Sequence, residues 1–413
     1  MHFGIISPPV SGHIHPFGAL GRELIRRGHR VTVIHMADLC AKVQAEQLEF
    51  LIIGESDHPK GSLPESLAAL TRLSGLSALR FTISAVRKTT EMFCRDAPGE
   101  IARAGIDALL VDQTEPAGAS IAEHLGIPFV TVCCALALNR EPTVPPPFTG
   151  WSYSTGPWNI LRNEIGYIAY SQVMKPVTEV ISKYRRSWNL NPYKDPEQSF
   201  SPLAQISQQP AAFDFPRRGL PSNFHFVGPL RDARNSEFPF PWHRLNGKPL
   251  VYASLGTLQN RKLEVFRSFA EACADLPVQL VITHGNGLNE TAVSRLPGSP
   301  LVVGYAPQLE LLARTRLTLT HAGLNTVLDS LTHGVPLVAV PITYEQPAIA
   351  SRIRFTGVGE VVSLKRLNAG NLREIISRVL NDPSYLENAS QVKSSIAQAG
   401  GAVRAVDIIE SVL

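Results

Sequence analysis

The sequence has 413 residues, of which 44% are hydrophobic and 18% are charged, so it is long enough for two or more ordered domains and too apolar for a disordered chain. Its 39 basic and 35 acidic residues leave a net charge of +4, without the runs of like charge that are typical of nucleic-acid binding. The five cysteines lack the spacing of a zinc site or a disulfide framework, which favours the cytoplasm.

The first half of the chain alternates short apolar runs with amphipathic stretches, the pattern of βα units around a parallel sheet. The expected strands are 3–7, 30–35, 108–112 and 128–133. Helices are expected at about 16–27, 65–95 and 115–125. The chain is therefore expected to open directly into a strand, without a signal peptide, and it has no apolar run long enough to span a bilayer.

The second half repeats this alternation. Its expected strands are 250–254, 279–283, 301–303, 317–320, 337–340 and 359–362, with helices near 261–274, 323–333, 345–355 and 368–380. Between the halves, FHFVGPL at 224–230 is followed by a polar and Pro-rich stretch, 231–242, that has the composition of an interdomain linker. We expect an α/β protein with two Rossmann-like βαβ domains, 1–235 and 236–395, followed by a C-terminal helix at 396–413. The carboxyl ends of the two sheets should face one another across a cleft, where ligands bind in this architecture.

A turn rich in glycine and proline, residues 7–21, brings His13 to the start of the first helix. Its spacing is not the Gly-x-Gly-x-x-Gly fingerprint of a dinucleotide site. The strand 108–112 ends at Asp112, on the same edge as His13 if the sheet is parallel. A carboxylate there can orient an imidazole that acts as a general base. The alternatives are a solvated histidine and an aspartate that only caps the helix after it.

A second candidate site follows the strand 317–320. There the sequence His321-Ala-Gly-Leu-Asn-Thr326 turns into a helix, with Asp329 one turn further on. A small turn that contains glycine at a helix N-terminus can bind phosphate through backbone N–H groups. His321, Asn325 and Thr326 add side-chain donors, and the Asp329 carboxylate suits ribose hydroxyls. The pattern predicts a site for a nucleotide diphosphate, and the alternative is an ordinary βα turn.

Residues 305–346 resemble the nucleotide-sugar signature of the family 1 glycosyltransferases. They contain, in order, Tyr-x-Pro-Gln, His-x-Gly-x-Asn-Thr, Gly-Val-Pro and Glu-Gln. The elements Gly12-His13-Ile14-His15-Pro16 and Ser254-Leu-Gly-Thr257 resemble two further motifs of that family. Within the family, HAGLNTVLDSL is most similar to bacterial enzymes of the zeaxanthin glucosyltransferase type. The resemblance covers essentially the whole chain and implies the GT-B fold, in which the last helix crosses back onto the N-terminal domain.

The resemblance also implies roles for single residues in an inverting transfer that uses no metal or other cofactor. His13 would be the general base, oriented by Asp112. The donor-binding residues would be Thr257, His321, Gly323, Asn325 and Thr326 at the diphosphate, Gln308 and Asp329 at the ribose, Tyr305 at the base, and Glu345 and Gln346 at the sugar. The family more often has Trp, Glu and Asp at positions 305, 329 and 345, so the base and the sugar stay open.

The expected reaction moves a sugar, glucose from UDP-glucose, to a hydroxyl of a small apolar acceptor such as a carotenoid, a polyphenol, a macrolide or a sterol. The expected partners are the UDP-sugar and this acceptor, not nucleic acid, and the chain is expected to act as a monomer. Two alternatives are a UDP-sugar 2-epimerase on the same scaffold and a non-catalytic protein that binds nucleotide sugars.

Basic residues beside apolar helix positions raise the hypothesis of peripheral contact with the inner face of a membrane. These residues are Arg80, Arg87 and Lys88, and Lys183, Arg185 and Arg186 near Trp188. The competing interpretation is two solvated helix faces.

Overall fold

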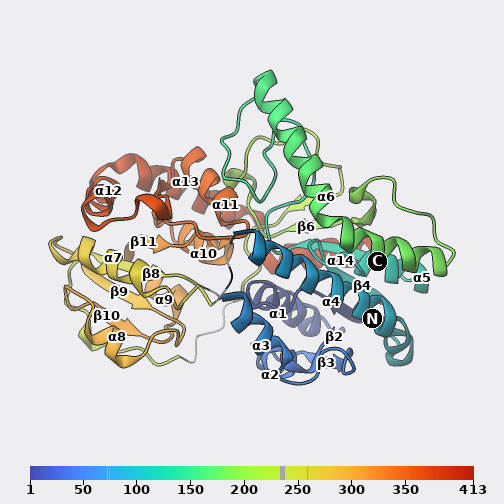
Figure 1. The fold of residues 1–413 in the computed structure, drawn as a ribbon. Helices are drawn as coiled ribbons and strands as arrows, with labels where there is room; N and C mark the ends of the chain where they lie inside the picture. The colour runs from blue at the N-terminus through green and yellow to red at the C-terminus, as the bar shows by residue number, and fades with distance from the viewer. Residues whose placement is uncertain (72, 74, 233–237, 258) are drawn as a thin grey trace.

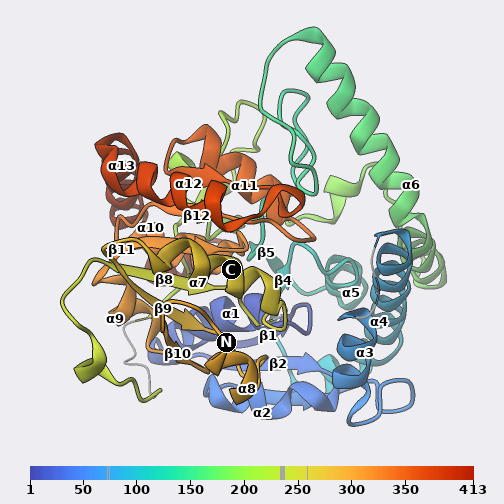
Figure 2. The same ribbon diagram turned by 60° about the vertical axis from the view of Figure 1, so that its left-hand side comes forward.

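The structure is a computed structural model, and it describes residues 1–71, 73, 75–232, 238–257 and 259–413. Two parallel β-sheets, each covered by helices on both faces, lie side by side (Figures 1 and 2). The domain boundary predicted at residue 235 lies outside the described residues.

The first sheet contains, among the described residues, seven parallel strands in the order β3-β2-β1-β4-β5-β6-β7. The strands are β1 (His2–Ile6), β2 (Arg30–His35), β3 (Glu49–Ile52), β4 (Ala108–Asp112), β5 (Phe129–Cys133), β6 (Gln205–Ser207) and β7 (Phe224–Phe226). The helices are α1 (Ser11–Arg26), α2 (Cys40–Ala45), α3 (Ser62–Thr71), α4 (Gly75–Ala104), α5 (Gly118–Leu125) and α6 (Pro157–Ser187). The strand order reverses between β1 and β4, so their carboxyl ends lie next to each other at the switch point where ligands bind in such sheets.

The second sheet contains, in the described part of the chain, six parallel strands in the order β10-β9-β8-β11-β12-β13. The strands are β8 (Leu250–Ser254), β9 (Gln279–Thr283), β10 (Leu301–Val303), β11 (Thr315–Thr320), β12 (Leu337–Ala339) and β13 (Gly359–Val361). The helices are α7 (Leu263–Ala274), α8 (Glu290–Ser294), α9 (Gln308–Leu312), α10 (Leu324–Thr332), α11 (Gln346–Phe355), α12 (Ala369–Asn381) and α13 (Pro383–Ala399). Here the order reverses between β8 and β11, which places the loops after these two strands side by side.

The predicted buried strands are confirmed, five of them to the residue: 30–35, 108–112, 250–254, 279–283 and 301–303. One helix prediction was wrong, and three strands were missed. The helix expected over 65–95 is two helices, α3 and α4, and strand β7 was not expected at 224–226. Strands β3 and β6 were missed, because β3 is only partly buried and β6 has three residues with two polar side chains.

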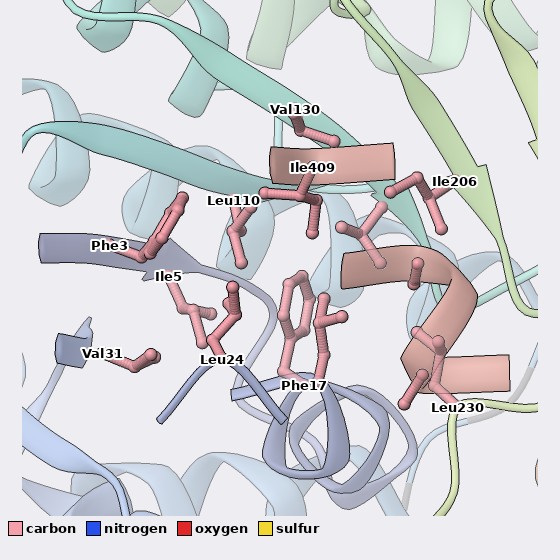
Figure 3. Close-up of a cluster of buried hydrophobic side chains, with 14 of the residues drawn as sticks. Phe3, Ile5, Phe17, Leu24, Val31, Leu110, Val130, Ile206, Leu230 and Ile409 are labelled. Atoms are coloured by element: carbon pink, nitrogen blue, oxygen red, sulfur yellow. The ribbon is translucent and has the colours of Figure 1, made fainter. Parts of the chain in front are cut away.

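The last helix, α14 (Gly401–Val412), packs on the first sheet and not on the second. The chain breaks between α13 and α14 at Gly400 and Gly401, which have positive φ angles of 90° and 58°, a backbone conformation that glycine adopts without strain. Figure 3 shows Ile409 of α14 among Leu110, Val130 and Phe17, side chains of the first domain's core. The C-terminus therefore ties the two domains together.

A buried ion pair also joins the domains. The Arg352 guanidinium, on α11, donates from Nε to Oδ1 of Asp214 at 2.7 Å, and both side chains are almost fully buried. Arg217 donates to the other oxygen of Asp214 at 3.1 Å. Because an unpaired buried charge is costly, these three side chains fix how the second domain sits on the first.

Candidate active site

The side chains of His13 and Asp112 meet at the switch point of the first sheet. His13 is the third residue of α1, and Asp112 ends β4. The distance between His13 Nδ1 and Asp112 Oδ2 is 2.7 Å. The other oxygen of Asp112 accepts hydrogen bonds from the backbone N–H and the hydroxyl of Thr114. The carboxylate is thus held from both sides, and it fixes the tautomer in which Nδ1 carries a proton and Nε2 is free to accept one.

The environment of this pair sets its protonation. Burial lowers the pKa of His13, but the charge of Asp112 and its hydrogen bond outweigh burial and raise that pKa above its ordinary value. Burial also opposes ionisation of Asp112, yet the His13 charge and the hydrogen bonds from His13 and Thr114 keep the pKa of this carboxyl below its ordinary value. Asp112 therefore stays ionised and makes His13 a stronger base.

A second carboxyl, Glu115, lies beside the pair. It is buried, and its Oε1 has no hydrogen-bond partner among the described residues. Burial and then the charge of Asp112 raise the pKa of Glu115 to about 8, against a hydrogen bond from the backbone N–H of Ala117. The pKa values of the Asp112 and Glu115 carboxyls are therefore shifted in opposite directions, because Asp112 has several hydrogen-bond donors around it and Glu115 has few.

A thiol completes the surroundings of the pair. A ring nitrogen of His13, an Asp112 oxygen and Cys134 Sγ all lie within 4.8 Å of one another, so these three side chains are the group in the described residues that could hold a metal ion. Burial, then Asp112, raises the pKa of the Cys134 thiol well above its ordinary value. A metal ion there would have to displace the proton of the thiol, because metals bind the deprotonated ligand.

On the second domain, His321 and Gly323 lie in the turn between β11 and α10, next to the loop after β8 that carries Thr257. The His321 ring packs between two glycines: a Cβ atom would lie 2.8 Å from it at Gly256 and 2.6 Å from it at Gly323. Burial lowers the pKa of His321 to about 4. The ring is therefore neutral, and its Nδ1 has no partner among the described residues, so this atom is available to a ligand.

The N-termini of α1 and α10 touch across the domain boundary. Asn325, the second residue of α10, donates from Nδ2 to the carbonyl of Gly12, the second residue of α1, at 2.9 Å. Its Oδ1 accepts from Gln208 of the first domain at 3.1 Å. The first N–H groups of a helix lack partners within it, and both helix dipoles present their positive ends here. The contact therefore favours an anion such as a diphosphate.

The predicted ribose ligands, Gln308 and Asp329, contact each other. Gln308 Nε2 donates to Asp329 Oδ2 at 2.7 Å, and Gln308 Oε1 accepts from the Tyr252 hydroxyl at 2.9 Å. Arg231, which follows β7, donates to the other oxygen of Asp329 at 2.9 Å. Asp329 is thus ion-paired to the first domain, a contact that the sequence did not predict.

The predicted base platform, Tyr305, lies at the surface after β10 and is 41% exposed. Its ring stacks on Phe238 with centroids 5.0 Å apart and planes 16° from parallel. Sequence reasoning did not single out Phe238, although aromatic residues in a polar stretch between two domains are a usable signal.

The predicted sugar ligands occupy one loop but differ in their contacts. Glu345 Oε2 accepts from the backbone N–H of Leu136 of the first domain at 3.1 Å, and its charge acts on His13. Burial raises the pKa of Glu345. Gln346 instead uses its Oε1 to accept from the backbone N–H groups of Ile342 and Thr343, each at 2.9 Å. Glu345 therefore faces the pair on the first domain, whereas Gln346 holds its own loop. Of the other predicted ligands, Thr326 is buried in the first turn of α10.

Comparison with known proteins covers the whole chain. The sequence profile of the family described as "UDP-glucoronosyl and UDP-glucosyl transferase" matches residues 13–399. The zeaxanthin glucosyltransferase of Pantoea ananas is 36% identical over 415 residues, which cover 100% of this chain and 96% of that protein. The zeaxanthin glucosyltransferase of Pseudescherichia vulneris is 34% identical, over 100% of this chain and 98% of its own. Among solved structures, CalG4, the calicheamicin glycosyltransferase, is 25% identical and matches with a TM-score of 0.76, over 100% of this chain and 98% of its own.

Replacing Glu115 tests the ionisation of the site through stability. The pKa of Glu115 rises from its ordinary 4.5 to about 8 on folding. Between these values the folded chain keeps a proton that the unfolded chain has released, so this group makes the wild type less stable as pH rises. Glutamine does not titrate. We compare the unfolding free energies of Glu115→Gln and of the wild type, both measured by urea denaturation. The variant's value minus the wild type's value should increase by about 1.4 kcal/mol for each pH unit in this window. A difference that stays constant with pH would contradict the assignment.

Proposed function

Because the chain belongs to the UDP-glucoronosyl and UDP-glucosyl transferase family and has the GT-B fold of the glycosyltransferases, we propose that it transfers glucose from UDP-glucose to a hydroxyl of a small apolar acceptor. The transfer inverts the anomeric carbon and needs no metal. The observation that carries this proposal is the His13–Asp112 pair of the first domain, which faces the N-terminus of α10 and Glu345 of the second.

The proposed reaction follows from this geometry. Nε2 of His13 accepts the proton of the acceptor hydroxyl, and the oxygen attacks the anomeric carbon. The bond from that carbon to the diphosphate breaks at the same time, and its electron pair leaves with UDP. Asp112 stabilises the imidazolium that forms, and the N-terminus of α10 stabilises the charge on the diphosphate. Attack from the side opposite to the leaving group inverts the configuration.

We assign the donor-binding residues within the same proposal. The diphosphate lies at the turn that carries His321 and at Thr257, with Asn325 and Thr326 at the start of α10. The ribose contacts Gln308 and Asp329, and the uracil stacks on Tyr305. Glu345 binds sugar hydroxyls, and Gln346 keeps the loop of Glu345 in place. Both oxygens of Asp329 already accept hydrogen bonds, but a carboxylate has further acceptor capacity for a ribose hydroxyl.

The names of two relatives support the choice of donor and acceptor. Two proteins at 36% and 34% identity over the whole chain are named zeaxanthin glucosyltransferases. We therefore propose glucose as the sugar and a hydroxylated carotenoid as the first acceptor to test. Metal independence is proposed because the helix N-termini can stabilise the charge of the diphosphate, and because Asp112 already hydrogen-bonds to both His13 and Cys134.

Replacing the base is the most direct mutational test. His13→Ala should lower kcat by about 10²–10⁴-fold, the usual contribution of a positioned base, and UDP affinity measured by calorimetry should be kept, because the donor residues lie on the other domain. His15→Ala is the matched control: His15 lies two residues further along α1, is exposed and contacts Glu46 at 2.6 Å. Its kcat should stay near that of the wild type. Equal losses in both variants, or no loss in His13→Ala, would exclude His13 as the base.

A product assay tests the reaction class and the absence of a metal together. Mass spectrometry of reactions with UDP-glucose and zeaxanthin, after dialysis against EDTA, should show the acceptor gaining one hexose and, after a second turnover, two. A rate that falls after EDTA and returns with a divalent cation would contradict metal independence. An epimer of a UDP-sugar formed without any acceptor would contradict the transfer itself.

A further inference from the structure

The N-terminal half of α6 carries four large apolar side chains that are exposed. Trp158, Leu161, Ile165 and Ile168 are 82%, 50%, 58% and 58% exposed. Their spacing of three and four residues places them on one face of the helix. We call these four residues the α6 stripe. Figures 1 and 2 show that this half of α6 stands out from the body of the molecule.

This half of α6 carries two charged side chains, Arg162 and Glu164, and both have partners within the first domain. Arg162 lies over the Trp151 ring and donates to the carbonyl of Ser152. Glu164, whose side chain is 40% exposed, pairs with Arg140. A helix half with four exposed large apolar side chains is not an ordinary solvated surface.

The same face of α6 becomes basic beyond residue 172. The exposed charged residues that continue it are Lys175, Glu179, Lys183 and Arg186. Helix α4, which packs along α6, adds the exposed Arg80, Arg87 and Lys88. Residues 75–90 and 157–188 together contain eight basic and two acidic residues. Since the whole chain has a net charge of +4, the rest of it has a net negative charge, and the excess positive charge lies on α4 and on α6, mostly on the C-terminal half of α6.

This surface overlaps only in part with the one that the sequence suggested. Within the cluster at 183–188, Arg185 is buried and pairs with Glu123 at 2.7 Å, and Trp188 stacks on His124 with ring centroids 4.4 Å apart. The other five basic residues of the hypothesis are exposed, whereas the exposed apolar residues lie at the N-terminal end of α6, away from that cluster.

We propose that the α6 stripe inserts into the headgroup region of a membrane that contains anionic lipids, while the basic residues of α4 and α6 contact the lipid phosphates. Tryptophan and isoleucine beside lysine and arginine are the composition of an interfacial helix face. A second copy of the chain is the competing occupant, and a dimer that needs the stripe is one outcome of the test. The described residues include no helix long and apolar enough to cross a membrane, so the contact is peripheral.

The proposed docking gives the site access to an apolar acceptor, and in this respect it rests on the proposed function. Helix α6 follows β5, the strand next to β4, which ends at Asp112. The segment that leads from the carboxyl end of β5 to the α6 stripe therefore starts at the sheet edge that holds the catalytic pair. An acceptor dissolved in lipid would reach His13 from this side.

The test is cosedimentation of the full chain with vesicles of phosphatidylcholine alone or of phosphatidylcholine and phosphatidylglycerol in equal parts. The wild type should sediment with the anionic vesicles and be released by high salt. Trp158→Glu/Ile165→Glu should bind at least about tenfold more weakly, since two buried apolar side chains are lost and two like charges are added. Leu386→Glu/Val403→Glu is the matched control, because it changes two other exposed apolar residues, on α13 and α14, and it should bind like the wild type.

Three results would overturn the proposal. The first is a wild type that does not bind anionic vesicles, and the second is a Trp158→Glu/Ile165→Glu variant that binds them like the wild type. The third is a wild type that is a dimer in sedimentation equilibrium while this variant is a monomer. UDP binding by calorimetry, done without vesicles, checks that each variant is folded, and Trp158→Glu alone serves as the milder second variant. Vesicle binding is measured without donor or acceptor, so a failure to bind UDP would count against the proposed function and not against docking.

Discussion

The contact between the N-termini of α1 and α10 is the constraint on which the site depends. Each helix brings the positive end of its dipole to the domain boundary, where Asn325 and Gly12 are 2.9 Å apart. Two such ends repel one another unless hydrogen bonds or an anion lie between them. The contact thus favours an anion at this point, and in the proposed function that anion is the diphosphate, bound next to His13, the residue that follows Gly12.

The same constraint explains why His13 needs Asp112. A histidine in the first turn of a helix is pushed toward its neutral form by the dipole, and burial acts in the same direction. The buried Asp112 carboxylate reverses the balance and raises the pKa of His13. Burial and the charge of Asp112 raise the pKa of Glu115 in the same surroundings, and burial acts on Asp112 in the same direction. The donors around Asp112 therefore keep this carboxyl ionised, and in the proposed mechanism it is the one that orients His13.

Features that depend on local sequence patterns and on neighbouring parallel strands could be predicted from the sequence. Strand 108–112 ends in Asp112 and strand 2–6 leads to His13, so two neighbouring parallel strands were enough to pair them. The contacts of Asp329 with Arg231 and of Asn325 with Gly12 depend on the angle between the domains, which no local pattern encodes. The pKa of Glu115 depends on burial by distant segments, and the exposure of Trp158 depends on where the 142–156 loop packs. Strand β7 was missed because three residues show no clear period.

The stereochemistry of transfer tests the proposed site most directly. UDP-glucose carries its diphosphate in the α configuration, and a hydroxyl activated by His13 attacks from the opposite side. Proton NMR of the isolated glucoside should therefore show the large H1–H2 coupling of a β-linked glucose. An α-linked product would contradict the proposed role of His13 and Asp112, because retention requires a second displacement or attack from the side of the leaving group.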